Sequence, residues 1–488
     1  MTGEAKSLAR FEGLKASEEL WATSFLQCLK VADQVELVHI PGTSGRPSYT
    51  EAIFLSDVGE LVCKLGVPGN PYSLPLNGSR TVPVGEFHKM LASGGAVIDE
   101  ISGGTVQDGF KWRATGLDPI SADAFLQVIT NANADAAYRD FVSLFDSNDR
   151  FLGRSVGNRF EPGAGNDRVT GGDGDDIVFK WKHGNLNFDG GAGHDILSFA
   201  TDGTSEPFPS TSVETLRLDL AQGAGRSPWG GKLVLTSVEE VRDTDGRDVI
   251  LGSGRGDTVQ GDHGGGDVVK LRGGDDTVRI FERAEGLTYD GGAGRDALVI
   301  SLGFGDSVLD LGDPARNAGN FAGARLSGVE VISASSIGAG STFRLTGTAA
   351  AETVSFAAGT FSGTPFARVI MGLGGGNDLA EGGGGDDVIA GGAGRDRIDG
   401  RAGDDRLSGG GQGDLFHFAA GFGHDRITDF FMGQDVLDFR DHEGGDGLRD
   451  LTIRQVGDDV RIGDGAGGVL VLDGIERGDL GSGDFLFA

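Results

Sequence analysis

The feature that most constrains this chain is a nine-residue repeat whose first six residues are Gly-Gly-x-Gly-x-Asp. The hexad occurs without mismatch at 171–176, 190–195, 291–296, 382–387 and 391–396, and degenerate copies continue it in steps of nine. The longest array has five units and covers 373–417. Each unit tends to carry an apolar residue two places after the Asp, such as Val178, Ile389 or Ile398. A regular short period of this kind predicts a solenoid of stacked coils.

Each part of the repeat has a physical role. Glycines permit positive φ, so the first six residues can turn sharply, and the last three form a short strand with one inward apolar side chain. Two units make one coil, and stacked coils lie about 4.8 Å apart. An Asp then recurs on the same face every 18 residues, which pairs Asp378 with Asp396, Asp387 with Asp405, and Asp396 with Asp414. Calcium–oxygen distances of about 2.3–2.6 Å allow one ion to join two such carboxylates.

Composition agrees with a chain whose charge is neutralised by cations. Glycine accounts for 88 of the 488 residues, and the formal net charge is −31. The acidic balance excludes a typical nucleic-acid binder, and the irregular glycine spacing with only 13 prolines excludes collagen. The sequence contains no apolar run of about 18 residues, so we expect no transmembrane segment.

The repeats resemble the RTX (repeats-in-toxin) calcium-binding β-roll, and the resemblance covers about 151–488. It implies a parallel β-roll that holds several Ca²⁺ ions, with ligands from repeat carboxylates and turn residues. The expected carboxylate ligands are Asp167, Asp176, Asp195, Asp248, Asp257, Asp267, Asp276, Asp296, Asp378, Asp387, Asp396, Asp405 and Asp414. The expected turn ligands are Gly382, Gly384, Gly391, Ala393, Gly400 and Ala402.

The resemblance also implies export by a type I (ABC-transporter) secretion system, which reads an uncleaved carboxy-terminal signal. The first ten residues lack the apolar core of a cleaved signal peptide. The segment Asp484-Phe-Leu-Phe-Ala488 is similar to type I secretion termini. We therefore expect an extracellular protein without a cleaved amino-terminal signal peptide. The two cysteines, Cys28 and Cys63, leave open whether a disulfide forms.

The expected fold is mostly β: a parallel β-roll or β-helix solenoid preceded by a small mostly-β module with one or two helices. The expected parts are that module at 1–150, coiled modules at 151–260 and 261–371, the main calcium roll at 372–418, and a cap with the secretion region at 419–488. The alternating segments 459–462 and 468–473 predict a hairpin in the cap. The segment 341–356 is expected to continue the coil without metal.

Glycine thins out in the amino-terminal module, and no nonapeptide occurs there. Alternation predicts strands at 34–40, 50–55, 60–65, 96–101 and 109–114, whereas helical spacing predicts helices at 17–29 and in the approach to the repeats, 118–129 and 135–145. The protease motif His-Glu-x-x-His is absent from the sequence.

Two functional hypotheses follow. The first is a secreted, non-enzymatic calcium-binding protein that folds outside the cell, with an adhesive or surface- or matrix-associated role and a partner there. The second is a secreted RTX hydrolase or toxin with residues 1–150 as an unrecognised cargo domain. A pocket lined by His, Asp, Glu or Ser in 1–150 would favour the second, and an exposed flat strand or aromatic patch would favour the first.

Overall fold

The computed structural model describes residues 34–40, 49–55, 61–68, 79–83, 97–105 and 109–121 as strands, and also describes 148–153, 157–180, 182–199, 215–244, 246–261, 266–302, 305–336, 340–356, 368–442 and 447–488. The chain divides into two compact units, 1–243 and 244–488, which are described separately. The boundaries expected at 150, 260, 371 and 418 stay predictions.

The first unit begins with an antiparallel sheet, in which β1 pairs with both β2 and β4 and β5 pairs with β3 and β6. Its strands are β1 (Gln34–Ile40), β2 (Tyr49–Leu55), β3 (Leu61–Pro68), β4 (Ser79–Pro83), β5 (Val97–Thr105) and β6 (Gly109–Ser121). All five predicted strands lie here, the first with the predicted bounds and the other four with shifted ends. The helix predicted from Asp118 is wrong for its first four residues, because β6 continues to Ser121. Its remainder and the helices at 17–29 and 135–145 lie outside the described residues.

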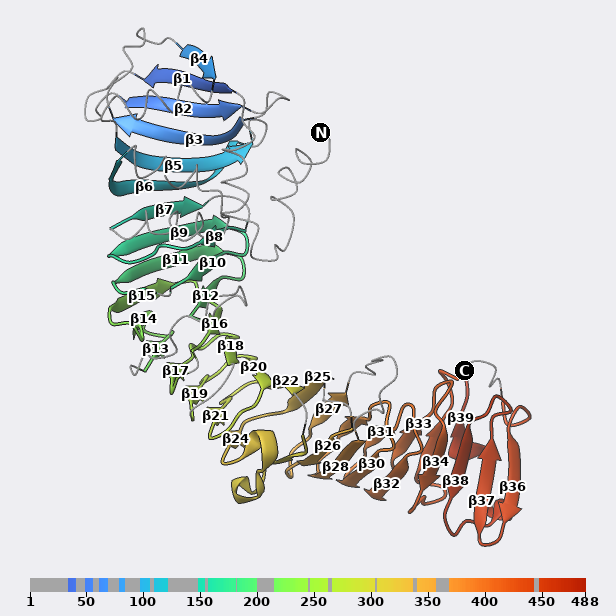
Figure 1. Cartoon of the computed structure of the whole chain (residues 1–488). Coiled ribbons are helices and arrows are strands. Elements are labelled where there is room, and N and C mark those ends of the chain that lie inside the picture. The colour runs from blue at the N-terminus through green and yellow to red at the C-terminus, as the bar shows by residue number, and fades with distance from the viewer. Residues whose placement is uncertain are drawn as a thin grey trace. The chain divides into compact units, whose positions relative to one another are not determined.

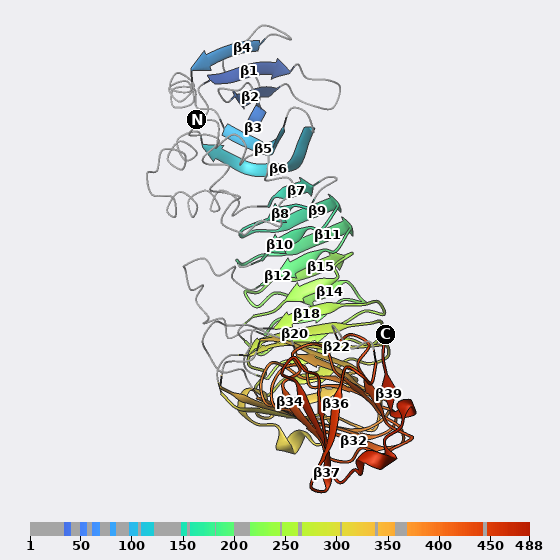
Figure 2. The same ribbon diagram turned by 90° about the vertical axis from the view of Figure 1, so that its right-hand side faces the viewer.

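From residue 150 onward the first unit is a parallel solenoid. One sheet contains β7 (Arg150–Gly153), β9 (Asp167–Asp173), β11 (Leu186–Ala192) and β15 (Lys232–Thr236), which the antiparallel strands β13 (Arg217–Asp219) and β14 (Ala224–Arg226) extend. The other contains β8 (Arg159–Phe160), β10 (Ile177–Phe179), β12 (Ile196–Ser198) and β16 (Glu240–Arg242). Figure 1 shows the successive rungs, and Figure 2 shows the two sheets side by side.

The second unit continues the same architecture. Its first set of parallel strands is β17 (Val249–Leu251), β19 (Val268–Lys270), β21 (Thr288–Asp290) and β24 (Arg325–Ser327). The sheet opposite contains β18 (Thr258–Gly261), β20 (Thr277–Glu282), β22 (Ala297–Leu302), β25 (Val331–Ser336), β27 (Thr353–Phe356), β29 (Leu379–Glu381), β31 (Arg397–Asp399), β33 (Leu415–His417), β35 (Val436–Asp438) and β39 (Phe485–Leu486).

A third sheet of the second unit contains β23 (Ser307–Asp310), β26 (Thr342–Thr346), β28 (Arg368–Gly375), β30 (Val388–Ala393), β32 (Arg406–Gly411), β34 (His424–Ile427) and β38 (Val469–Leu472). The predicted hairpin of the cap is confirmed, because β37 (Asp459–Gly463) pairs antiparallel with β38 and is followed outward by β36 (Thr452–Val456). Short 3₁₀ helices lie at η1 (Pro314–Arg316), η2 (Gly319–Phe321), η3 (Arg477–Asp479) and η4 (Ser482–Asp484).

The coil step follows the repeat length. In the main array Val388 pairs with Arg406 and Arg397 pairs with Leu415, a step of 18 residues, as expected. Elsewhere the step lengthens, for example to 19 between Ile177 and Ile196. The short strands of the main array each bury an apolar side chain, and those of Ile398 and Leu407 are fully inaccessible. The core is thus one narrow apolar column per sheet. The predicted parallel β-roll is confirmed.

Candidate metal centre

The repeat aspartates are buried because of their position relative to the inward apolar residue. Side chains two residues apart on a strand point to the same face, so an Asp two places before a buried residue also points inward. Asp396 is 3 % exposed and Ile398, two residues later, is fully buried. All thirteen aspartates expected as ligands are buried in this way. The fold therefore carries carboxylates into an interior where ionised groups need partners.

One oxygen of most of these carboxylates has a partner in the preceding coil. The backbone N–H of Asp378 donates to Oδ1 of Asp396 at 2.9 Å, and that of Asp396 donates to Oδ1 of Asp414 at 2.9 Å. The N–H of Asp387 donates to Oδ1 of Asp405 at 2.8 Å. The three pairs expected from the sequence thus lie one coil apart in the same row. We call this arrangement the carboxylate ladder.

The ladder extends through both units. In the first unit the N–H of Asp176 donates to Asp195 Oδ1 at 2.9 Å. In the second unit the same bond links Asp248 to Asp267 at 2.8 Å, Asp257 to Asp276 at 2.7 Å and Asp276 to Asp296 at 2.9 Å. The contact therefore repeats wherever two repeat aspartates follow each other along a row.

The second oxygen of most ladder carboxylates has no hydrogen-bond partner. Among the described residues this is true of buried Oδ2 atoms in Asp176, Asp195, Asp276, Asp296, Asp378, Asp396, Asp405 and Asp414. A buried acceptor without a partner costs about 1–3 kcal/mol, and more when it is charged. Rows of such atoms, one coil apart, are therefore suited to an added cation.

Where a hexad begins with glycine, that residue lies directly beside Oδ2 of the hexad's own Asp. A Cβ atom built on Gly391 would lie 2.3 Å from Oδ2 of Asp396, and one on Gly400 would lie 2.2 Å from Oδ2 of Asp405. A Cβ atom on Gly382 would lie 2.7 Å from Oδ2 of Asp387. Any side chain at these positions would fill the space next to the carboxylate. This explains the glycine without reference to backbone flexibility.

Several aspartates use their second oxygen to cap their own turn. Oδ2 of Asp387 accepts the N–H of Gly383 at 2.7 Å, and Oδ2 of Asp257 accepts that of Ser253 at 2.5 Å. Oδ2 of Asp248 accepts both the N–H and the hydroxyl of Thr244, at 2.9 and 2.8 Å. Because their second oxygen already accepts a hydrogen bond, these carboxylates would gain less from a bound cation than those with a free oxygen. The ladder thus contains two kinds of position.

Burial raises the pKa of the ladder carboxyls. The pKa of Asp405 rises to about 8 because of burial, with the negative charge of Asp387 adding to the shift. That of Asp378 rises to about 7 through burial and its neighbours Glu352 and Asp396. Burial also raises the pKa of Asp167, although the nearby Lys180 ammonium opposes the shift. Without a cation, the fold therefore favours protonated carboxyls at these positions.

Six further acidic residues belong to the ladder, although the glycine motif does not identify them. Their bonds are Asp149 N–H to Asp167, Asp195 N–H to Glu239, Asp296 N–H to Glu330, Glu352 N–H to Asp378, Asp405 N–H to Asp425 and Asp414 N–H to Asp435. Each of the six lies two residues before a buried apolar side chain: Phe151, Val241, Ile332, Val354, Ile427 and Leu437. An acid followed by any residue and a buried apolar residue is therefore the wider signal.

The donor set fits calcium. Among the described residues no three side chains of His, Cys, Asp or Glu converge on one point, so a metal ion would take its remaining ligands from backbone carbonyls. Calcium takes six to eight oxygen ligands and accepts carbonyls and carboxylates alike. The free Oδ2 atoms next to glycine turns provide such oxygens. Gly384, Ala393 and Ala402 stay predicted carbonyl ligands.

A parallel solenoid with rows of buried carboxylates defines the class of this protein as a β-roll. Comparison with protein families then identifies the repeats: residues 161–179, 373–407 and 381–416 match the RTX calcium-binding nonapeptide repeat (4 copies). The matched segments are therefore RTX calcium-binding nonapeptide repeats. No curated protein matches the chain.

Among solved structures, the chain is similar to the extracellular lipase LipA from Serratia marcescens. The sequences are 14 % identical over 90 % of this chain and 80 % of the lipase, with a TM-score of 0.19. The family assignment rests on the repeats and not on this likeness. In the described part of the chain, no helix has the length and apolarity needed to span a bilayer.

Proposed function

We propose that this chain is an extracellular calcium-binding scaffold that folds when Ca²⁺ enters the carboxylate ladder. The observation that carries the proposal is the series of buried, unpartnered Oδ2 atoms one coil apart, most of them beside a hexad glycine. The buried carboxylates named above all take part in this ladder. That common role supports binding rather than catalysis as the function of the solenoid.

Calcium supplies positive charge to these carboxylates when it is bound. Extracellular calcium modules have Kd values on the order of 10⁻⁴–10⁻³ M, far above cytosolic calcium levels. An ion that binds only the folded form adds about RT ln(1 + [L]/Kd) to its stability. The repeats would therefore stay unfolded in the cytosol and fold outside, which suits export by a type I secretion system.

The carboxy-terminal segment supports export of the unfolded chain before it folds. Asp484 is buried and accepts the N–H of Gly433 at 2.9 Å and that of Gly481 at 2.7 Å. Phe485 is also buried, and β39 pairs with β35. Secretion machinery that recognises this segment would have to engage it before the cap folds.

The test is a far-UV circular dichroism titration of the full chain, from a chelator to about 10 mM Ca²⁺. We expect a disordered spectrum to become a β spectrum as calcium rises, whereas Mg²⁺ at the same concentration leaves it disordered. A full β spectrum already in the chelator would show that folding does not depend on calcium.

A further inference from the structure

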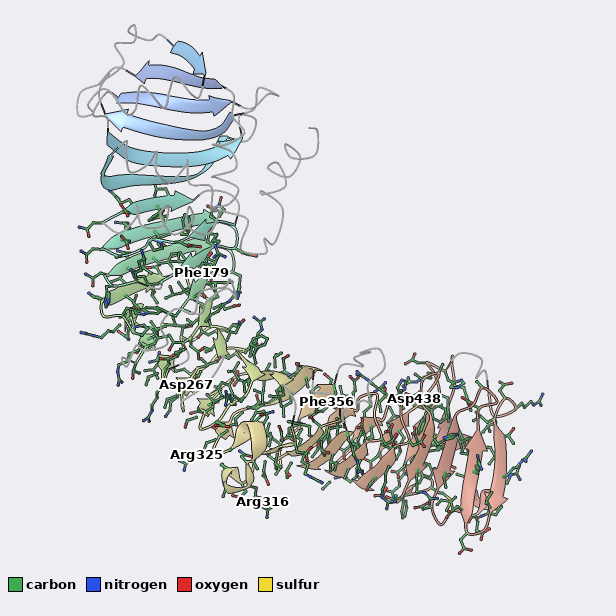
Figure 3. The ribbon with its side chains drawn as sticks, viewed as in Figure 1. Phe179, Asp267, Arg316, Arg325, Phe356 and Asp438 are labelled. Carbon is green, nitrogen blue, oxygen red and sulfur yellow. The ribbon has the colours of Figure 1, made fainter. Side chains whose placement is uncertain are left out.

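Lys180 is a fully buried cation in the interior of the first unit. It directly follows β10, one residue after Phe179, which Figure 3 labels. Its Nζ donates a hydrogen bond of 2.8 Å to the carbonyl oxygen of Gly163 and lies 3.6 Å from Oδ2 of Asp167. The side chains of Lys180 and Asp167 are both 0 % exposed. The ammonium thus contacts a turn carbonyl and a ladder carboxylate at once.

Lys180 occupies the first position of a repeat unit, which is glycine in every hexad without mismatch. Gly171 and Gly190 follow their units in the same way, and a Cβ atom on either would lie 2.1 or 2.3 Å from the Asp Oδ2 of its own hexad. The turn after Lys180 has no such carboxylate, because Leu186 is the residue that pairs in register with Asp167. The loss of an Asp makes room for a long side chain.

The two departures from the repeat therefore compensate each other. Leu186 removes a carboxylate from the row, and Lys180 adds a positive charge to the carboxylate that remains. The other side of Asp167 keeps the ladder contact, since its Oδ1 accepts the N–H of Asp149 at 3.1 Å. Asp149 is also buried, so the ammonium lies in a strongly acidic interior.

A second basic side chain makes a similar contact in the second unit. Arg272 replaces the second glycine of the hexad 271–276, and its guanidinium donates to the carbonyl oxygen of Gly252, in the turn one coil earlier. Gly252 opens the hexad that ends in Asp257. In both units, a basic residue in an imperfect hexad thus binds a carbonyl of the preceding turn.

We propose that the Lys180 ammonium is a built-in cation that takes the place of calcium in the turn 162–167. Asp167 then differs from the aspartates of the main array: it binds no calcium, and its turn keeps its cation at every calcium concentration. The inference rests on the proposed calcium binding of the other repeats. It identifies Lys180 as a positioning residue that no glycine-based motif would reveal.

Bound calcium per chain, measured by equilibrium dialysis at saturating Ca²⁺, separates the two proposals. We expect Asp396→Asn to lose at least one ion and Asp167→Asn to bind as many ions as the unmodified chain. Loss of an ion from Asp167→Asn would overturn the Lys180 inference and leave the proposed function intact. An unchanged count in Asp396→Asn would instead contradict the proposed function.

Urea unfolding at saturating calcium tests the role of the ammonium. We expect Lys180→Met to lower the urea midpoint, because Asp167 loses its cation, and the added change Asp167→Asn to restore part of the loss. A Lys180→Met midpoint equal to that of the unmodified chain would overturn the inference. If Lys180→Met does not fold, Lys180→Arg keeps the charge and should fold, and the calcium count of Asp167→Asn still decides the question.

Discussion

Replacement of Asp396 by asparagine should destabilise the protein in calcium and not in its absence. Asp396 lies in the middle of a row, one coil from Asp378 and one coil from Asp414, with hydrogen bonds of 2.9 Å on both sides. Asparagine keeps the oxygen that accepts the N–H of Asp378. It removes the charge and the free Oδ2 that the structure leaves without a partner.

The expected magnitude follows from the position of the residue. At about 10 mM Ca²⁺ and Kd values on the order of 10⁻⁴–10⁻³ M, each site adds about 1.4–2.7 kcal/mol to the free energy of unfolding. Asp396 faces two gaps between coils, so the variant should lose about 3–5 kcal/mol if both sites fail. In a chelator we expect no such loss, because the neutral amide, unlike the carboxylate, adds no buried charge that needs a cation.

Urea unfolding at 10 mM or so of Ca²⁺ measures the loss, and a calcium titration by circular dichroism measures the midpoint, which should rise. Asp386→Asn is the matched control, because Asp386 is exposed in the same array and only its Oδ1 accepts the N–H of Asp404, at 2.9 Å. Surface changes of this kind stay within about 0.5 kcal/mol. Equal effects of the two variants would refute the reasoning.

Three further expectations concern the same array. Gly391→Ala should raise the calcium midpoint, because its Cβ would lie 2.3 Å from Oδ2 of Asp396. Gly372→Ala is the control and should leave the midpoint unchanged, because a Cβ there would meet nothing within 4 Å. Equal midpoints would contradict the view that glycine keeps space open beside the carboxylate. Without calcium, β structure should increase as the pH falls from about 8 towards 4. The reason is that the pKa of Asp405 in the folded state, about 8, lies above its ordinary value, so the folded state loses stability as the pH rises through it. A circular dichroism signal that does not change with pH would count against this. Phe416→Ala should cost about 3–5 kcal/mol in urea unfolding with calcium, and Phe431→Ala, which is 59 % exposed, should cost little; comparable losses would exclude a core role for Phe416.

Much of the solenoid could be predicted because each nine-residue repeat determines its own turn and strand. The nine-residue period determines the turn, the inward apolar residue and the burial of the Asp two places earlier, so the pairing of Asp378 with Asp396 followed directly. The prediction weakened where loops lengthen the coil, as between Ala297 and Val331, which pair 34 residues apart. The acid and the apolar residue persist in such coils while the glycines do not.

The chemical detail of the ladder could not be predicted from spacing. Spacing alone suggested an ion directly between two carboxylates, whereas one oxygen of each already accepts a backbone N–H. Glu352 lies in a stretch expected to lack metal, yet its backbone N–H donates to Asp378 and its own Oε2 is buried without a partner. Lys180 appears in the sequence only as a departure from the repeat, and its role depends on which side chain faces Asp167.

The carboxylate ladder gives the solenoid a direction. In every rung named here the earlier coil donates its N–H and the later coil supplies the oxygen, as from Asp387 to Asp405 and from Asp405 to Asp425. Removal of coils from the amino-terminal side would leave each remaining turn with its acceptor. Removal from the carboxy-terminal side would strip the acceptor from the last remaining coil. The two ends of the roll are thus unequal, because each coil depends on the next coil toward the carboxy terminus for the acceptor of its Asp N–H.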